Sequence, residues 1–144
     1  MTARPSTARL DPHVRDALIK GIAEFNSWRF YDCHETLEDI WREAGSKGDS
    51  ATRANFYQGI IKAAAGFHHL VRGNYPGAVN LLEDTFRLLN PYRPATLGVD
   101  VDRLLAGVRG ALEGLQTLGA DRIAEFDRSL IPAIRFDPEA IGAP

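Results

Sequence analysis

The sequence predicts an all-α fold, a compact bundle of about five helices in which consecutive helices are mostly antiparallel neighbours. Apolar residues recur at the spacing of an amphipathic helix along successive stretches of the chain. The segments that join these stretches are short and rich in turn-forming residues, which favours antiparallel packing. No segment of useful length alternates apolar and polar residues as a half-buried strand would.

The first helix is expected over residues 11–27 and the second over residues 30–44. Asp11 is a preferred N-cap, and Pro12 fits the first helical position because no intrahelical N–H bond is lost there. Residues 45–50 have the composition of a loop. The apolar stripe of the second helix is formed by Phe30, Cys33, Leu37 and Ile40.

A third helix is expected to begin at Ser50 or Thr52 and to run to Arg72, with Gly73 as its terminator. It carries the run Ala63–Gly66, whose small side chains let two helix axes approach closely. We therefore expect this part of the third helix to be its closest contact with another helix.

The fourth helix starts with Pro76 in its first turn. It is expected to end at Asn90, because Pro91 disfavours the α conformation of the residue before it. The connection then runs to Gly98, and Asp100 caps a fifth helix.

Three segments are expected along the chain. Residues 1–10 form a flexible lead-in dominated by Thr, Ser, Pro and Arg, residues 11–118 form the helical bundle domain, and residues 119–144 form a short helical piece and a tail. No internal linker divides the bundle, and 144 residues suffice to bury the core of one domain.

Composition limits the partners and the compartment. The net charge is −2 and basic residues are scattered, so no nucleic-acid or membrane partner is expected. The single cysteine, Cys33, excludes an intramolecular disulfide. No apolar run approaches the ~18 residues of a membrane-spanning helix, and the first residues lack the apolar centre of a secretory signal. We therefore expect a cytoplasmic protein.

His34, Glu38 and Trp41 lie directly beside the apolar stripe of the second helix, at positions i, i+4 and i+7. Side chains at i and i+4 have Cβ atoms about 5–6 Å apart, and polar groups at the edge of a core are partly desolvated. We expect His34 and Glu38 to interact directly or through one atom or one water molecule, and if the site holds a metal ion, these two residues are its expected ligands. Glu35 lies about 100° from His34 around the helix and is expected to face another direction. A complete metal site needs three or four ligands.

The third helix offers two further polar groups, Gln58 and His68. They are about 15 Å apart along the helix axis, so only one of them can join His34 and Glu38. In an antiparallel pair, Glu38 and Trp41 lie nearer Gln58, and the start of the second helix lies nearer His68. We predict a polar seam of His34, Glu38 and Gln58, with His68 at its other end.

Each of these residues also has a structural interpretation. His34 and Glu38 can be a hydrogen-bonded pair that only stabilises the bundle, and His68 can serve the negative end of a helix dipole. Trp41 is expected to pack between helices. Cys33 is expected to be a core residue, because adjacent helical positions point about 100° apart and it cannot form a dyad with His34.

Two signatures carry a family resemblance. They are Phe30-Tyr31-Asp32-Cys33-His34-Glu35 with Glu38 and Trp41, and Phe56 with Gln58-Gly59-Ile60-Ile61, His68-His69, Gly73-Asn74 and Gly77-Ala78. Together they resemble the bacterial and archaeal domain-of-unknown-function family 309 (DUF309), over about residues 21–101. The resemblance implies a small all-helical protein and supplies no activity. The positions that match the family pattern are His34, Glu35, Glu38, Trp41, Gln58 and His68.

These six residues define the expected site between the second and third helices. We expect it to bind a small polar ligand or a divalent metal ion without turnover. One alternative is a metal-dependent hydrolase in which His34 and Glu38 hold the metal and Glu35 or His68 moves protons. The other is an interaction module, in which the polar residues tie helices together and an apolar face meets a partner or a second copy of the chain.

Overall fold

The computed structural model describes residues 10–46 and 51–140 of the chain. The α-helices of these residues are α1 Pro12–Asn26, α2 Phe30–Ser46, α3 Ala51–Val71, α4 Tyr75–Leu89 and α5 Val101–Leu118. Short 3₁₀ turns lie at η3 Asn90–Tyr92, η4 Ala120–Glu125, η5 Arg128–Leu130 and η6 Pro138–Ala140. Two short strands, β1 Ala95–Thr96 and β2 Val99–Asp100, precede α5.

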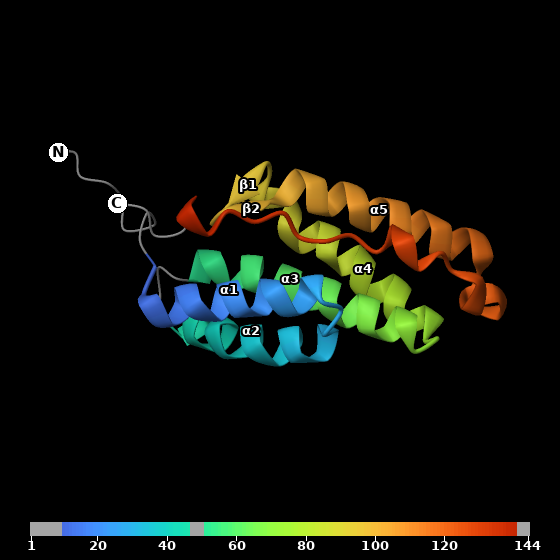
Figure 1. Ribbon diagram of the computed structural model, residues 1–144, viewed down its shortest axis with the longest axis horizontal. Helices are drawn as coiled ribbons and strands as arrows, with labels where there is room; N and C mark the ends of the chain where they lie inside the picture. Colours follow the sequence, from blue (N-terminus) through green and yellow to red (C-terminus); the bar gives the residue numbers. More distant parts are fainter. Residues whose placement is uncertain (1–9, 47–50, 141–144) are drawn as a thin grey trace.

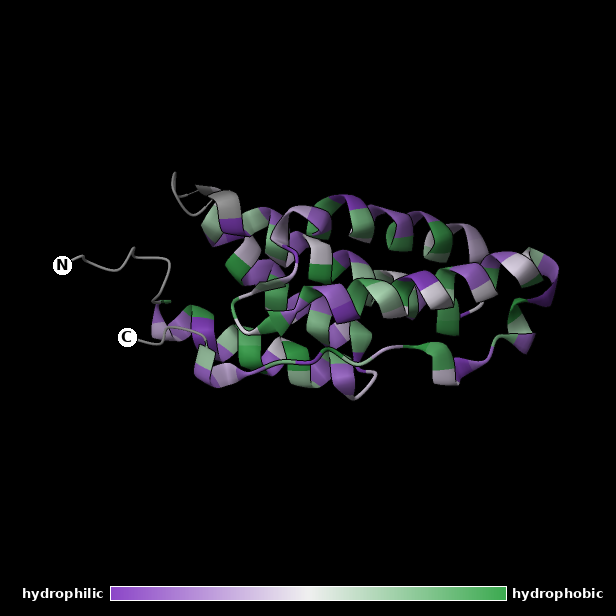
Figure 2. Ribbon diagram, turned by 90° about the horizontal axis from the view of Figure 1, so that it is seen from above, coloured by the Kyte–Doolittle hydropathy of each residue, from purple (hydrophilic) through white to green (hydrophobic). Residues whose placement is uncertain are grey.

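Consecutive helices pack against one another and run in opposite directions (Figure 1). The central helix is α3, which contacts α2 and α4, while α1 packs on α2 and α5 packs on α4. Apolar positions of the helices gather between them and polar positions lie outward (Figure 2). The predicted all-α bundle with antiparallel neighbours is therefore confirmed.

Two predicted helix starts are confirmed by their capping contacts. Asp11 Oδ1 accepts a hydrogen bond from the His13 backbone N–H at 2.8 Å, and Pro12 is the first residue of α1. Asp100 Oδ1 accepts from the Arg103 backbone N–H at 2.9 Å at the start of α5. Each cap satisfies a donor that the first helical turn leaves without an intrahelical partner.

The helix ends differ from the predictions in detail. Helix α2 continues to Ser46, and the rest of the predicted loop, residues 47–50, lies outside the described residues, as do residues 1–9 of the predicted lead-in. Helix α4 ends at Leu89, but Asn90 keeps helical angles of φ −52° and ψ −41°, so the expectation that Pro91 forces it out of the α region is wrong. Pro91 instead removes an N–H from the ladder, and the chain tightens into η3.

The turn between α1 and α2 uses a left-handed residue. Trp28 has φ 62°, and its N–H donates to the Phe25 carbonyl at 3.0 Å, while the Arg29 N–H donates to the Glu24 carbonyl at 2.8 Å. Glycine is the usual residue at such a helix end. The Trp28 ring stacks on Phe30 at a centroid distance of 6.4 Å, which offsets part of the strain and fixes the start of α2.

A hairpin that the sequence did not predict joins η3 to α5. Strands β1 and β2 pair antiparallel, with Thr96 opposite Val99. The turn residues Leu97 and Gly98 have φ 50° and 81°, as a tight two-residue turn requires. Two residues per strand are too few to produce a detectable alternation in the sequence.

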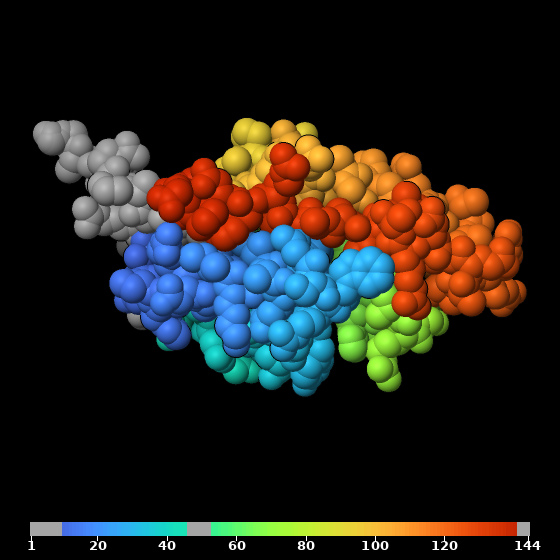
Figure 3. Space-filling model, viewed as in Figure 1, coloured from blue at the N-terminus to red at the C-terminus, as the bar shows by residue number. Residues whose placement is uncertain are grey.

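Residues 119–140 cross back over the bundle between α1 and α5 (Figures 1 and 3). The Asn26 side chain fastens this segment, because its Nδ2 donates to the Ile134 carbonyl at 3.0 Å and its Oδ1 accepts from the Ile134 N–H at 2.7 Å. Phe126 and Ile131 are 7% exposed. The segment predicted as a short helical piece and tail thus covers part of the core.

The closest approach between helices lies along one face of α3. A Cβ atom on Gly66 would meet Leu82 Cδ2 at 2.8 Å, so the predicted run Ala63–Gly66 does form a tight contact with α4. A Cβ on Gly59 would meet the side chain of Leu89 more closely still. Gly59 and Gly66 are two helical turns apart, so they share one face, and the tight contact extends beyond the predicted run.

We expect Gly59→Ala to lower the free energy of unfolding by about 1–3 kcal/mol, because Leu89 is fully buried and has no room to move. The control is Gly110→Ala in α5, where a Cβ would meet nothing within 4 Å. That change should be neutral or stabilise by up to about 1 kcal/mol. Urea unfolding measures both, and equal effects of the two substitutions would contradict the close contact.

Candidate functional site

Helix α2 presents its polar edge because its apolar stripe is fully buried. The stripe residues Phe30, Cys33, Leu37 and Ile40 are at most 2% exposed, as the spacing predicted. Beside them the side chains of His34 and Glu38 are 32% and 26% exposed. These two groups are therefore partly desolvated yet reachable from solvent, which is the environment in which a ligand site is expected.

His34, Glu35 and Glu38 come together on this edge. Each offers one ligand atom, and these atoms all lie within 4.8 Å of one another. His34 Nδ1 is 3.6 Å from Glu35 Oε2, and Glu38 Oε2 is 3.3 Å from Arg42 Nη2. The expected proximity of His34 and Glu38 is thus present in the structure.

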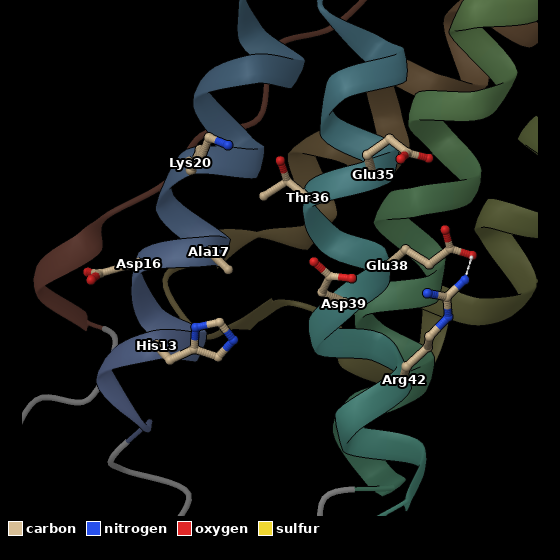
Figure 4. A pocket seen from close by; sticks show the side chains of 9 residues that line it. All are labelled: His13, Asp16, Ala17, Lys20, Glu35, Thr36, Glu38, Asp39 and Arg42. Carbon is tan, nitrogen blue, oxygen red and sulfur yellow. Dashed lines mark ion pairs between the residues drawn. The ribbon is translucent and has the colours of Figure 1, made fainter.

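Glu35 does not face away from His34, and this part of the prediction is wrong. The backbone directions of the two residues differ by about 100°, but a glutamate has enough methylene groups to bring its carboxylate back toward its neighbour. Figure 4 shows Glu35 and Glu38 on the side of α2 that is away from α1. The Glu35 side chain is 56% exposed, as expected.

The Nδ1 atom of His34 is buried and has no hydrogen-bond partner among the described residues. Glu35 at 3.6 Å is too distant to accept a hydrogen bond from it. Buried polar atoms are rarely left without a partner, since each costs about 1–3 kcal/mol. The unpaired imidazole nitrogen lies next to two carboxylates, so it can still take a hydrogen-bond partner or a cation as a ligand.

The aromatic side of His34 faces α3. The rings of Tyr31 and His34 stack with centroids 6.2 Å apart and an interplanar angle of 20°, and Tyr31 also contacts the His68 ring at 6.0 Å. A pocket of about 190 Å³ lies here. It is lined by Phe30, Tyr31, His34, Ala65, His68 and His69.

The antiparallel packing of α2 and α3 thus brings His68, and not Gln58, to His34. Among the described residues, Gln58 makes no hydrogen bond to His34 or Glu38. It lies about 10 Å along α3 from Ala65, which lines the pocket beside His34. The predicted placement of His68 beside the start of α2 is thus present in the structure, and Glu35 approaches His34 as well. The membership of Gln58 in the seam stays a prediction.

Trp41 is half-buried and packs against the hydrophobic core, in line with its structural interpretation. Cys33 is fully buried. Burial, and next the negative charge of Glu24, raise the pKa of the Cys33 thiol to about 12. A thiol in this state is a poor nucleophile and a poor metal ligand.

His68 lines the pocket and has an imidazole pKa that departs clearly from its ordinary value. Burial lowers the pKa of His68, and the positive charges of Arg72, His69 and His34 lower this pKa further. His68 is therefore a neutral imidazole at pH 7, able to accept a proton or donate one hydrogen bond.

A second concave surface, which the sequence reasoning missed, lies between α1 and α2. In Figure 4, His13 and Lys20 of α1 point toward α2, and Thr36 and Asp39 of α2 point toward α1. The groove is wide and polar, and these residues read from the sequence as ordinary solvated positions. No signal in the sequence distinguishes them, because each helix supplies only a few exposed polar residues.

The fold and the His/Glu cluster define a small helical protein with three potential ligand groups on its second helix. The model of the family described as domain of unknown function (DUF309) matches residues 18–81 of this chain. The predicted resemblance is confirmed there, and the segment contains His34, Glu35, Glu38, Trp41, Gln58 and His68. The predicted extension to residue 101 lies outside the matched range.

A relative of the chain is the uncharacterized protein YpuF of Bacillus subtilis (strain 168). The two are 33% identical over 107 residues, which cover 72% of this chain and 59% of the relative. The chain therefore matches less than two thirds of the relative's length. Within the described residues, no helix is long and apolar enough to cross a membrane.

Burial of Cys33 predicts a thiol that does not react in the folded protein. At pH 8 we expect 5,5′-dithiobis(2-nitrobenzoate) to label the native chain much more slowly than the chain in guanidinium chloride, where one thiol reacts promptly. Because the folded pKa is about 12 against an ordinary value of 9.0, the stabilising contribution of the neutral thiol is complete below pH 9.0 and is lost between pH 9.0 and about 12. Prompt labelling of the native chain would contradict the burial of the Cys33 thiol.

Proposed function

We propose that this protein is a binding module for a divalent metal ion, held on α2 by His34, Glu35 and Glu38. The observation that carries the proposal is the mutual approach of one ligand atom from each residue to within 4.8 Å. Imidazole and carboxylate groups are the usual ligands of Zn²⁺ and of related transition-metal ions. Three protein ligands leave at least one coordination position for water or a small polar molecule.

The surroundings of the three ligands also support this function. The unpaired Nδ1 of His34 gains a partner when an ion binds. The two carboxylates, which repel each other when no cation lies between them, become neutralised. Arg42 competes for Glu38 at 3.3 Å, and this contact is solvent-exposed on the arginine side, so its loss costs little.

The hydrolytic alternative needs a proton acceptor near the ion. His68 shares a pocket with His34, and its lowered pKa keeps it neutral at pH 7. Ester hydrolysis by the metal-loaded protein that is lost in His68→Gln, with metal affinity retained, would favour an enzyme over a binding module.

Isothermal titration of Zn²⁺ and Mn²⁺ into untagged, chelator-treated protein tests the proposal. We expect one equivalent to bind, and we expect His34→Gln and Glu38→Gln to weaken binding by at least about tenfold, which corresponds to about 1.4 kcal/mol.

The matched control is Asp39→Asn, which alters the neighbouring carboxylate of α2 that points toward α1 instead. It should leave metal affinity unchanged. Absence of stoichiometric binding, or equal losses in Asp39→Asn and Glu38→Gln, would overturn the proposed function.

A further inference from the structure

The pocket between the start of α2 and the end of α3 is separate from the acidic cluster, although both use His34. Its floor is apolar, since Phe30 is 2% exposed and Ala65 contributes a methyl group. Its volume of about 190 Å³ suits a small molecule. A buried apolar cavity of about 150 Å³ accommodates benzene, so this pocket has room for one ring and a small substituent.

The walls of the pocket are planar rings. Tyr31 is 58% exposed although it is a large aromatic side chain, and its ring stands nearly parallel to His34 and at 46° to His68. The exposed face of Tyr31 favours an occupant that is itself flat, because stacked and edge-to-face contacts are each worth about 0.5–1.5 kcal/mol beyond burial. An occupant would also cover the exposed face of Tyr31.

The lining of the pocket offers imidazole groups and no competing acid. None of its lining residues is acidic, whereas three are histidines. Arg72 lies close enough to His68 to act on its charge, together with His69 and His34. The acid nearest to this group is Glu35, which approaches His34 Nδ1 and does not line the pocket. A carboxylate on the occupant could accept hydrogen bonds from the imidazole N–H groups without meeting an acidic side chain in the lining.

One of the pocket histidines has a fixed tautomer. Asn74 Oδ1 accepts the Gly77 backbone N–H at 3.1 Å as the N-cap of α4, so its Nδ2 is the atom that faces His69 Nδ1, at 3.1 Å. Nδ2 can only donate, so Nδ1 of His69 accepts and the ring proton resides on Nε2. A Cβ on Gly77 would crowd this arrangement, at 2.9 Å from Asn74 Nδ2 and 3.1 Å from His69 Cγ. His69 thus has an Nε2–H donor prepared for an acceptor.

From the flat walls, the apolar floor, the missing acids and the prepared donor, we infer that this pocket binds a small aromatic or heteroaromatic carboxylate. The ring packs on Phe30 and Tyr31, and the carboxylate is met by the imidazoles of His68 and His69. This ligand class extends the proposed function without depending on it, because binding needs no metal ion.

The test uses the full-length chain after chelator treatment, with benzoate as the probe and NMR chemical shifts as the readout. We expect saturable shifts at Tyr31, Ala65 and His69. Benzamide, which has the same ring and no charge, should bind about fivefold more weakly or worse. Cyclohexanecarboxylate, which has the charge and no flat ring, should also bind more weakly.

A variant that fills the pocket provides the second arm. Ala65→Leu should weaken benzoate binding by about tenfold or more, because the added carbons occupy the floor. The matched control, Ala23→Leu on the exposed face of α1, should leave binding unchanged. Thermal unfolding establishes that both variants are folded.

Three results would overturn the inference: no saturable shifts with benzoate, equal affinity for benzamide, or unchanged benzoate binding in folded Ala65→Leu. If Ala65→Leu does not fold, the comparison of the three probes on the unmodified chain still decides the question. Because metal ions are absent, failure here leaves the metal-binding proposal standing. Failure of metal binding, in turn, leaves this pocket untouched.

Discussion

Burial of one apolar stripe on α2 is the constraint on which the rest of this structure depends. Its four members are at most 2% exposed, so only one rotation of α2 about its axis keeps them out of water. That rotation places His34 and Glu38 at the margin of the core, where they are partly desolvated but accessible. The positions of His34 and Glu38 thus follow from the apolar packing of α2, and no further interaction is needed to place them.

The central helix, α3, sets the other half of the site. Its glycine face, Gly59 and Gly66, draws α4 close, and its opposite side packs on α2. This double contact fixes α3 along its own axis and so decides which of its residues reach the start of α2. His68 and His69 do so near the end of the helix, and the cap of α4 at Asn74 then orients His69. The turn between α3 and α4 therefore influences the pocket through the hydrogen bond from Asn74 to His69.

His34 belongs to two environments, an acidic cluster on one side and an aromatic pocket without acidic residues on the other. A ligand that changes the position or charge of its ring in one environment must affect affinity in the other, by the reciprocity of linked binding. The match to the family supplies no activity, and a helical bundle supports many functions, so the function has to be argued from this residue and its neighbours.

The sequence alone determined the helices, the caps at Asp11 and Asp100, the buried stripe of α2 and the proximity of His34 to Glu38, because all of these depend on residues within one or two helical turns. Tertiary structure decided the choice of His68 over Gln58, the tight contact at Gly59, the hairpin at Leu97–Gly98 and the return of residues 119–140 across α1. It also revealed that Glu35 turns back toward His34, a matter of side-chain reach that a helical wheel omits. Contacts between distant segments depend on how helices slide and rotate against one another, and that is settled by the packing of the whole core.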